Sequence, residues 1–345
     1  MLTGSPGGPG IFRRRRRKPG AEGVLGVIVL LQALTVAVGG PPTSSEYLPL
    51  RVAEAEGHFA REGVQVTLQG ARGDVAAAEA LARGEVDLAA SSLDPMLRFG
   101  LRLRSQEPVL VLGLTAAPPV ALLVSTRLAS PIRSVRDLAG RRVGVSAPGA
   151  PEIAWLAGLL SRARLSFGDV SVASLGHRRL AGALRRGDVD AALVLEPDAS
   201  ALVKDGHAAV LADLRTPDAT ARALDASTVN AAVFARRDRR PDEAALEAFA
   251  RAVLAAEALI ARESPAALAA RLPPAVVGAP EEFARRVEAS RALYLPGGRV
   301  SAQRLRESID LIRDHMPLPA TVRLPALQDL LHDAPVTRAG RPPER

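Results

Sequence analysis

The sequence contains no cysteine and only two lysines, Lys18 and Lys204. Without cysteine it can form no disulfide framework, zinc-thiolate site, iron–sulfur cluster or cysteine nucleophile. The five histidines are widely separated, so they form no metal motif. A Walker phosphate loop and a dinucleotide glycine fingerprint are also lacking, and Gly144–Pro148 misses the nucleophile elbow because proline holds its fifth position. We therefore expect neither metal nor cofactor, and the same absences argue against an enzyme.

What the chain does contain is enough apolar residues for a sizeable core. Its 345 residues are 48% hydrophobic and 24% charged, which is typical of a globular protein and excludes global disorder. The length favours about two domains.

The positive charge is concentrated near the amino terminus. The net charge is +8, but six positive charges lie in Arg13–Lys18, and with Glu22 set aside the chain from Leu34 onward carries about +3. A basic block followed by the apolar stretch Val24–Leu31 is typical of a secretory signal. We expect residues 1–33 to be a signal peptide cleaved near Ala33, with an uncleaved membrane anchor or an over-long start as the alternatives. The charge therefore predicts export and no nucleic-acid partner.

From Leu34 onward, short β-rich runs alternate with helical patterns, as in parallel βαβ units. The expected strands are Leu34–Val38, Val64–Gln69, Asp87–Ala90, Val109–Leu114, Val120–Ser125, Arg142–Ser146, Val170–Leu175, Ala191–Leu195 and Val229–Ala235. After Asn230 the pattern predicts helices over 243–263, 265–271 and 281–294, and one from the N-cap Ser301 to about Met316. Residues 335–345, rich in Arg and Pro, are expected to be a disordered tail.

One segment recurs within the chain. Leu81–Ala90 (LARGEVDLAA) is repeated as Leu184–Leu193 (LRRGDVDAAL). Each copy predicts a helix that ends at glycine, an acidic-Val-Asp turn, and a strand that enters a core. Two similar α/β lobes would produce this repeat, although helix-Gly-strand junctions are common in any α/β protein.

Two polar loops follow expected strands, where ligands of open α/β sheets bind. In Gly39–Tyr47, glycines allow close backbone approach, hydroxyls supply hydrogen bonds and Tyr47 can stack. In Ser146–Glu152, free amides at a helix start form an anion site. The alternatives left open are a plain turn with a core tyrosine and an ordinary helix start.

Several motifs resemble the nitrate, sulfonate and thiamine-precursor branch of periplasmic solute-binding proteins. The similar segments, in family order, are 46–50 (EYLPL), 53–64 (AEAEGHFAREGV), 84–89 (GEVDLA), 134–145 (SVRDLAGRRVGV) and 187–192 (GDVDAA) with Glu196-Pro197. His58-Phe59 and Arg51 depart from the aromatic residues usual in the family, and no motif distinguishes one ligand from another.

The resemblance implies an α/β, type 2 periplasmic-binding-protein fold, with two α/β sandwich lobes around a central cleft and two hinge crossovers. The first lobe would comprise residues 34–118 and 228–334, and the second residues 119–227. Such a protein is monomeric and periplasmic, closes on a small organic or anionic ligand, and delivers it to an ABC permease and its ATPase. An enzyme on the same fold, acting on a thiamine-precursor-like metabolite, is the alternative.

By family position, twelve residues would line the cleft: Thr43, Ser44, Tyr47, Ser91, Ser92, Thr115, Ser146, Gly149, Ala150, Gly176, Glu196 and Asn230. Among these, Ser44, Ser92 and Ser146 are expected to donate hydrogen bonds to the ligand. The amides of Gly149 and Ala150 would meet an anionic or carbonyl group. Glu196 would either bind a ligand nitrogen or secure the interface between the lobes.

Overall fold

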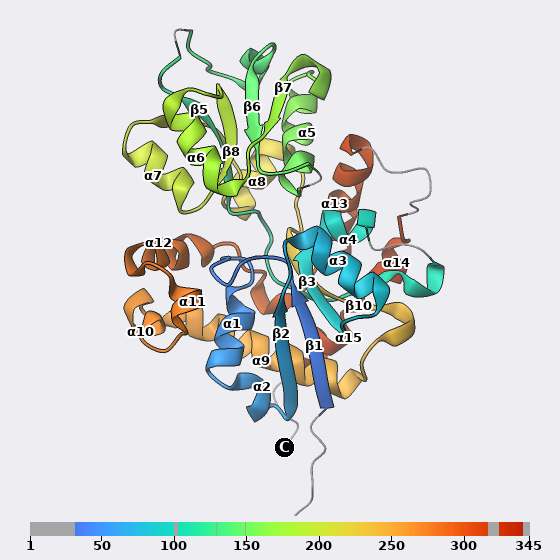
Figure 1. Ribbon diagram of the computed structural model, residues 1–345. Coiled ribbons are helices and arrows are strands. Elements are labelled where there is room, and N and C mark those ends of the chain that lie inside the picture. The colour runs from blue at the N-terminus through green and yellow to red at the C-terminus, as the bar shows by residue number, and fades with distance from the viewer. Residues whose placement is uncertain (1–31, 100–102, 129, 149, 317–323, 341–345) are drawn as a thin grey trace, which may run out of the picture. The chain divides into compact units, whose positions relative to one another are not determined.

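The computed structural model describes residues 32–99, 103–128, 130–148, 150–316 and 324–340. Within these ranges the chain forms two five-stranded sheets, each covered by helices on both faces (Figure 1). We call the part built on the first sheet the first lobe and the part built on the second sheet the second lobe. The expected signal peptide lies outside the described residues, apart from Gln32 and Ala33, which begin the first strand.

The first sheet has the order β2-β1-β3-β10-β4, with β1, β2 and β3 parallel and β10 antiparallel to both of its neighbours. Its strands are β1 (Gln32–Val38), β2 (Val64–Gly70), β3 (Leu88–Ser92), β4 (Pro108–Gly113) and β10 (Ala231–Arg236). The helices of the first lobe, in chain order, are α1 (Leu48–Ala55), α2 (His58–Arg61), α3 (Asp74–Arg83), α4 (Leu93–Phe99), α9 (Glu243–Arg262), α10 (Pro265–Ala269), α11 (Pro274–Val277), α12 (Pro280–Ser290), α13 (Ala302–His315), α14 (Leu327–Leu330) and α15 (Ala334–Ala339).

The second sheet repeats this order as β7-β6-β8-β5-β9. Its strands are β5 (Val120–Ser125), β6 (Arg142–Val145), β7 (Ser171–Ser174), β8 (Ala191–Leu195) and β9 (Ala208–Asp213), and its helices are α5 (Glu152–Arg162), α6 (His177–Arg186), α7 (Asp198–Lys204) and α8 (Pro217–Leu224). Strands β6, β7 and β8 are parallel, and β5 is antiparallel to both β8 and β9. The chain passes from the first sheet to the second through residues 114–119 and returns through residues 225–230.

The internal repeat occupies equivalent places in the two sheets. Gly84 and Gly187 end α3 and α6 with positive φ angles of 70° and 81°, which glycine adopts without steric cost. Asp87 Oδ2 then accepts a 2.7 Å hydrogen bond from a backbone N–H of β1, and Asp190 Oδ2 accepts a 2.8 Å bond from a backbone N–H of β6. The Asp of each copy therefore anchors the neighbouring strand of its sheet, β1 or β6, which explains why the acidic-Val-Asp turn recurs.

The nine expected strands are all present, but the sequence does not predict strand β9 or the short helices α11, α14 and α15. Edge strand β9 has a partly exposed pattern, with Ala209 and Val210 exposed, and so gives little hydrophobic signal. The expectation of a disordered tail is wrong for residues 335–339, because they form most of α15, whose Val336 is 2% exposed and joins the core beside α9. Two buried residues, Pro335 and Val336, thus hold a segment whose composition suggests disorder.

Candidate functional site

A cleft of about 760 Å³ is lined by loops of both lobes. In the first lobe its walls are the β1–α1 loop, the start of α3, and α12; in the second they are the starts of α5, α6 and α7. These loops follow the carboxyl ends of β1, β6, β7 and β8, where ligands of α/β sheets bind. The polar and aromatic residues among its walls include Thr43, Ser44, Glu46, Tyr47, Asp74, Glu152, Trp155, His177, Arg178, Arg179, Glu196, Asn230, Glu282 and Arg286.

The structure divides the twelve expected residues into three groups. Thr43, Ser44, Tyr47, Gly176, Glu196 and Asn230 line the cleft. Ser91, Ser92, Thr115, Ser146 and Ala150 are not among the lining residues; the first four are at most 3% exposed, and Ala150 donates its amide to Ala147 at 3.3 Å. Gly149 lies outside the described residues.

Asp74, the first residue of α3, connects this helix to the β1–α1 loop and to the end of β3. Its Oδ1 accepts hydrogen bonds from the Tyr47 hydroxyl and, at 3.0 Å, from the backbone N–H of Ser92. Its Oδ2 accepts the Ser92 hydroxyl at 3.2 Å. Burial raises the pKa of Asp74, although these three hydrogen bonds act to lower it. In this structure the Ser92 hydroxyl therefore orients a carboxylate of the cleft.

Glu46, a residue of the β1–α1 loop, lies beside Asp74. Its carboxylate accepts hydrogen bonds from the Asn230 amide at 2.7 Å and from the Ser44 hydroxyl at 3.2 Å. Burial and the charge of Asp74, with a smaller effect from Glu152, raise the pKa of Glu46 to about 7, while its two hydrogen bonds act to lower it. Glu46 therefore changes its charge close to neutral pH.

Glu152 supplies a carboxylate from the second lobe. It is the first residue of α5 and is 9% exposed, and its Oε1 accepts hydrogen bonds from the Ser146 hydroxyl and, at 2.9 Å, from the Ser146 backbone N–H. One turn further along α5, Trp155 lines the cleft and is 6% exposed. Ser146 thus orients a carboxylate, as Ser92 does in the first lobe.

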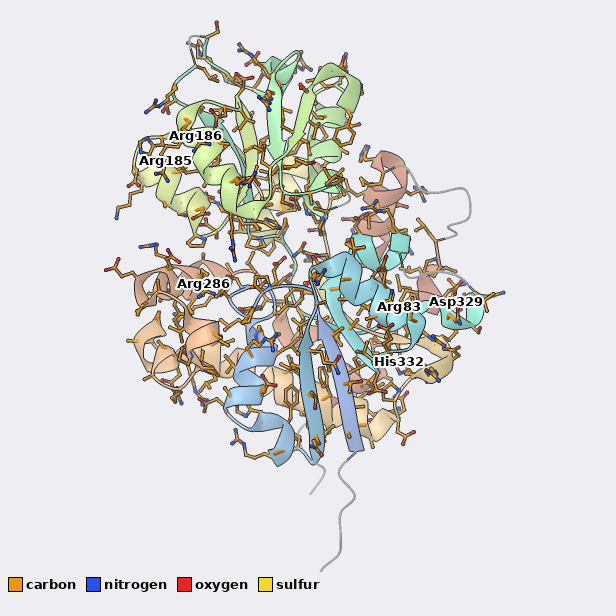
Figure 2. All side chains as sticks on the ribbon, viewed as in Figure 1. Arg83, Arg185, Arg186, Arg286, Asp329 and His332 are labelled. Carbon is orange, nitrogen blue, oxygen red and sulfur yellow. The ribbon has the colours of Figure 1, made fainter. Side chains whose placement is uncertain are left out.

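Arg286 of α12 fixes the β1–α1 loop (Figure 2). Although it lines the cleft, its guanidinium donates to the carbonyls of Thr43, Val276 at 3.2 Å and Val277 at 2.7 Å, and the residue is 7% exposed. A planar guanidinium can satisfy several carbonyls at once in this way. Its role is to join α11 and α12 to the loop that carries Glu46.

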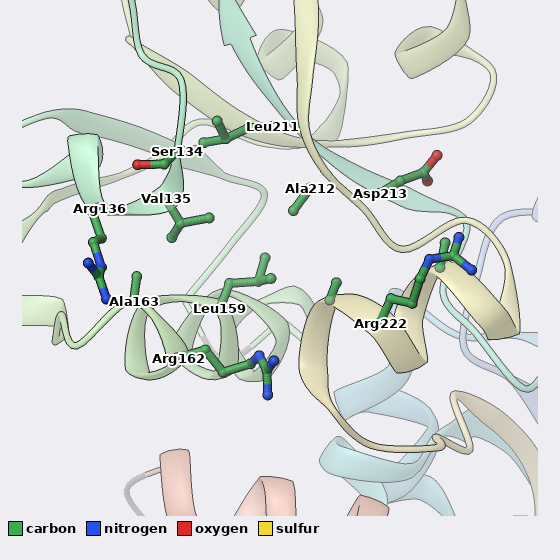
Figure 3. Close-up of a pocket in the computed structure, with 12 residues that line it drawn as sticks. Ser134, Val135, Arg136, Leu159, Arg162, Ala163, Leu211, Ala212, Asp213 and Arg222 are labelled. Carbon is green, nitrogen blue, oxygen red and sulfur yellow. The ribbon is translucent and has the colours of Figure 1, made fainter.

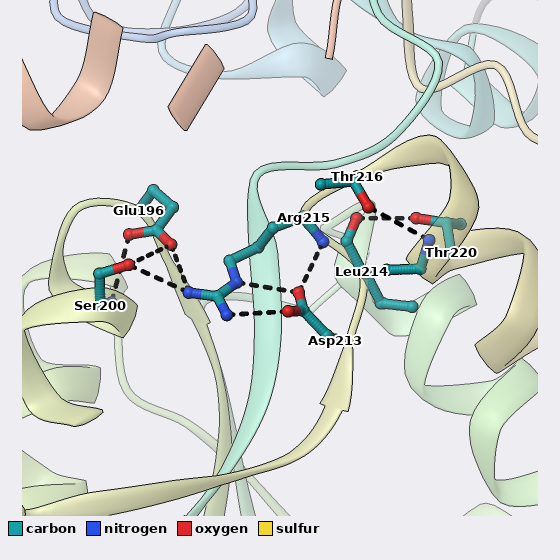
Figure 4. A network of polar contacts seen from close by, with 8 residues as sticks. Glu196, Ser200, Asp213, Leu214, Arg215, Thr216 and Thr220 are labelled. Atoms are coloured by element: carbon teal, nitrogen blue, oxygen red, sulfur yellow. Dashed lines mark hydrogen bonds and ion pairs between the residues drawn. The ribbon is translucent and has the colours of Figure 1, made fainter. Parts of the chain in front are cut away.

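Glu196 is engaged within the second lobe (Figure 4). Its Oε1 accepts hydrogen bonds from Arg215 at 2.6 Å and from the Ser200 hydroxyl at 2.7 Å, and Arg215 also forms an ion pair with Asp213 at 2.8 Å. The hydrogen bonds that Arg215 donates to these two carboxylates raise its pKa. These contacts all lie within the second lobe and do not secure the interface between the lobes, and the ligand-binding role expected for Glu196 stays a prediction.

A second hollow, of about 660 Å³, lies on the second lobe (Figure 3). Arg162 of α5 and Arg222 of α8 border it, and Val135, Leu159 and Leu211 contribute apolar walls. Arg162 pairs with Asp225 at 3.2 Å. Because all lining residues of this hollow come from one lobe, it does not offer the two-sided contacts that the cleft offers.

In the parts of the chain that the structure describes, no group of three or more His, Asp or Glu side chains is placed to hold a metal ion. In the same parts, no helix is long and apolar enough to span a membrane.

Sequence reasoning missed four residues of the site: Glu46, Asp74, Glu152 and Arg286. Asp74 and Glu152 each begin a helix, where an acidic residue is usual because it complements the helix dipole. Arg286 is one of many arginines, which are mostly exposed in proteins. Glu46 and Glu152 both stand in loops that the sequence identifies, Gly39–Tyr47 and Ser146–Glu152, and this position is the signal that could have found them.

Comparison with solved structures supports the fold. A protein of Bordetella bronchiseptica RB50 is 24% identical, with a TM-score of 0.74, over 89% of this chain and 96% of that chain. The periplasmic aliphatic sulphonate binding protein SsuA of Escherichia coli is 20% identical, with a TM-score of 0.66, over 84% of this chain and 90% of that chain. The desulfurization enzyme DSZB is 17% identical, with a TM-score of 0.59, over 88% of this chain and 98% of that chain.

These similarities show the two-lobed fold of periplasmic binding proteins, a description that one further structural relative carries in its name. No curated protein matches the sequence. The family model described as NMT1/THI5 like matches residues 44–265, and the chain therefore belongs to this family.

Proposed function

We propose that the protein is an extracytoplasmic solute-binding protein that captures a small molecule between its two lobes and delivers it to an ABC importer. The observation that carries this proposal is the shared cleft, to which Glu46 and Asp74 contribute from one lobe and Glu152 and Trp155 from the other. A ligand that contacts both walls stabilises the closed arrangement more than the open one, and this difference drives closure. Several structural relatives are named as sulfonate-binding proteins of this kind.

The proposal includes export and partners. Residues 1–33 would direct secretion and be removed near Ala33, or remain as a tether, and the mature protein would act as a monomer that meets a permease and its ATPase. Fusion of alkaline phosphatase behind residues 1–33 and behind a variant with Arg13–Lys18 replaced by neutral residues tests export. We expect activity only with the basic block present.

Binding and closure are tested together. Thermal-shift measurements with sulfonates, nitrate, amines, pyrimidines, flavins and aromatic acids should identify a ligand, because a molecule that binds only the folded state raises the melting temperature. Small-angle scattering should then show a smaller radius of gyration with that ligand than without it. Stabilisation without compaction would contradict capture by closure.

We also propose that the protein binds its ligand for transport and does not convert it. The chain has no cysteine, and DSZB shows that the same fold also serves an enzyme. Incubation of the purified protein with its ligand, followed by mass spectrometry, separates the two functions. Recovery of unchanged ligand is expected, whereas repeated turnover would establish the enzyme alternative.

A further inference from the structure

Of the carboxylates that line the cleft, three lie close enough to affect one another. Glu46 and Asp74 come from the first lobe and Glu152 from the second, and all three line the cleft. The charges of Asp74 and Glu152 both disfavour ionisation of Glu46, and the charge of Glu152 disfavours ionisation of Asp74. Like charges at such a site are costly unless a positive charge joins them.

The chain holds these carboxylates with neutral donors. Asp74 is bound by Tyr47 and Ser92, Glu46 by Ser44 and Asn230, and Glu152 by Ser146; the distances are given above. Hydroxyl, amide and backbone donors orient a carboxylate without cancelling its charge. Among the described residues none of the three forms a salt bridge, and only one oxygen of Glu152, itself 91% buried, has a hydrogen-bond partner.

The arginines of the cleft do not supply the missing charge. Arg286 is bound to three backbone carbonyls. Arg178 and Arg179 lie on the exposed first turn of α6. Arg215, which pairs with the cleft residue Glu196, does not itself line the cleft and is engaged in the second lobe. A metal ion does not fit either, since the described residues offer no metal-binding group.

Trp155 adds a second requirement on the ligand. This side chain is 94% buried and lines the cleft, and no hydrogen bond of its indole N–H is found in the described part of the chain. Indole rings attract cations through their faces, and the indole N–H can donate one hydrogen bond to an acceptor. Both properties suit a ligand that carries a charged nitrogen and an acceptor.

We propose that the ligand of the cleft presents a positively charged nitrogen to Glu46 and Asp74, with Glu152 approaching from the second lobe, and that the cleft rejects a ligand whose buried group is an anion. This inference rests on the solute-binding function proposed above and names the class of its ligand. The buried group therefore differs from the sulfonate named for several structural relatives. An anionic substituent on the same ligand would point to Arg178 and Arg179 at the exposed wall.

The same arrangement links the ligand to closure. When the cleft is empty, closure brings the charge of Glu152 toward Glu46 and Asp74, and repulsion opposes it. A cation between the lobes turns this repulsion into attraction, so the closed state is favoured only when the ligand is bound.

The test screens a library of several hundred metabolites, divided equally into compounds with a cationic nitrogen and compounds that carry only negative charge, by thermal shift. Hits are then measured by calorimetry on the wild type, on Glu46→Gln and Asp74→Asn, and on the matched control Glu281→Gln, which removes a charge from the exposed start of α12. We expect cationic hits whose affinity falls at least tenfold in Glu46→Gln and Asp74→Asn and by less than twofold in the control. A hit with both charges is resolved with its two single-charge analogues, and loss of binding is expected when the nitrogen charge is removed.

The outcomes separate this inference from the function on which it rests. Hits that are purely anionic, with affinity unchanged or raised in Glu46→Gln, would overturn the ligand class and leave the solute-binding function intact. A library without any hit would count against both. If Asp74→Asn fails to fold because it weakens the bond with Tyr47, the nearly isosteric Glu46→Gln decides the question alone.

Discussion

The side-chain amide of Asn230 donates a 2.7 Å hydrogen bond to the carboxylate of Glu46, 184 residues away in the sequence. The same nitrogen donates to the Thr115 hydroxyl at 3.2 Å. Asn230 and Thr115 belong to the two segments that connect the lobes, and Glu46 belongs to the wall of the cleft. This contact therefore joins the ligand site to both crossings.

Replacement of Asn230 by alanine should weaken binding of a cationic ligand about tenfold at pH 7, since a hydrogen bond to a charged group contributes about 1.5–3 kcal/mol. Without this bond the pKa of Glu46 rises further, because the Asn230 amide acts to lower it. The difference in affinity between the wild type and the alanine variant should therefore be smaller at pH 9, where Glu46 is ionised in both proteins. Calorimetry at the two pH values measures this, and an equal deficit at both would show that Asn230 acts on something other than the charge of Glu46.

Alanine at both Ser92 and Ser146 should weaken ligand binding without unfolding the protein. Each hydroxyl donates to a carboxylate of the cleft, Ser92 to Asp74 and Ser146 to Glu152, and each carboxylate keeps a backbone N–H as partner. The loss for the pair should be about 1–3 kcal/mol, or roughly five- to 150-fold. Calorimetry, with circular dichroism as the folding control, measures it; unchanged affinity would refute a positioning role for both serines. The matched control Ser166→Ala removes a hydroxyl that bonds to Asp169 far from the cleft lining.

Ligand binding should release a proton near neutral pH. Burial first, then the charge of Asp74, sets the pKa of Glu46 at about 7, and Glu152, Tyr47 and Tyr294 are the other titratable groups that interact with it. A cation binds the ionised carboxylate, so affinity should rise by up to about tenfold per pH unit below 7 and level off above 8.

Calorimetry in phosphate and in Tris at pH 6.5 reveals the proton, because the apparent enthalpy then depends on the ionisation enthalpy of the buffer. Glu46→Gln should abolish the difference between the two buffers, and at pH 9 the wild type should show none. Proton uptake in place of release would contradict the assignment of Glu46 as the group that meets the cation.

The role of Arg286 is tested by a change that keeps its charge. Lysine at this position cannot donate to the carbonyls of Thr43, Val276 and Val277 together, because an ammonium lacks the planar fork of the guanidinium. Arg286→Lys should therefore lower affinity, reduce stability by about 1–3 kcal/mol and speed hydrogen exchange in residues 41–46. If the Arg286→Lys variant keeps the full affinity and the full protection from hydrogen exchange of the wild type, the charge of Arg286 matters and its hydrogen bonds to the loop do not.

The sequence predicts the framework because the relevant signals are local. Gly84 and Gly187 end helices in the left-handed conformation, and Asp87 and Asp190 directly precede the next strand of the chain, so the repeat can be recognised from residue order alone. Ser301 was likewise predicted as an N-cap, and its hydroxyl accepts the backbone N–H of Arg304 at 3.2 Å. The helix of residues 334–339 could not be predicted, because the burial of Val336 depends on its contact with distant α9.

For the site, the sequence predicts the loops but not the charges within them. Gly39–Tyr47 is marked by its glycines and hydroxyls at a strand end. The meeting of Glu46, Asp74 and Glu152 joins three separate segments, and nothing in the spacing of these acids along the chain indicates it. Burial by other elements determines their properties, and burial of polar groups is a property of the folded chain.

A half-buried glutamate outside the cleft should make the stability of the protein depend on pH. Glu257 of α9 has an Oε1 atom with no hydrogen-bond partner, and burial raises the pKa of Glu257 to about 8. Its folded-state pKa lies above the unfolded value of about 4.5, so the stability it contributes in the protonated form is lost as pH rises from about 4.5 through 8. Glu257→Gln removes the charge, and its free energy of unfolding above pH 8 should exceed that of the wild type by about 1–3 kcal/mol. Below pH 5 the free energies of unfolding of the wild type and of the Glu257→Gln variant should be nearly equal. Urea unfolding at pH 5, 7 and 9 measures the difference, with the exposed Glu281→Gln as control; a constant gap at all three pH values would mean that packing, and not ionisation, distinguishes the variant.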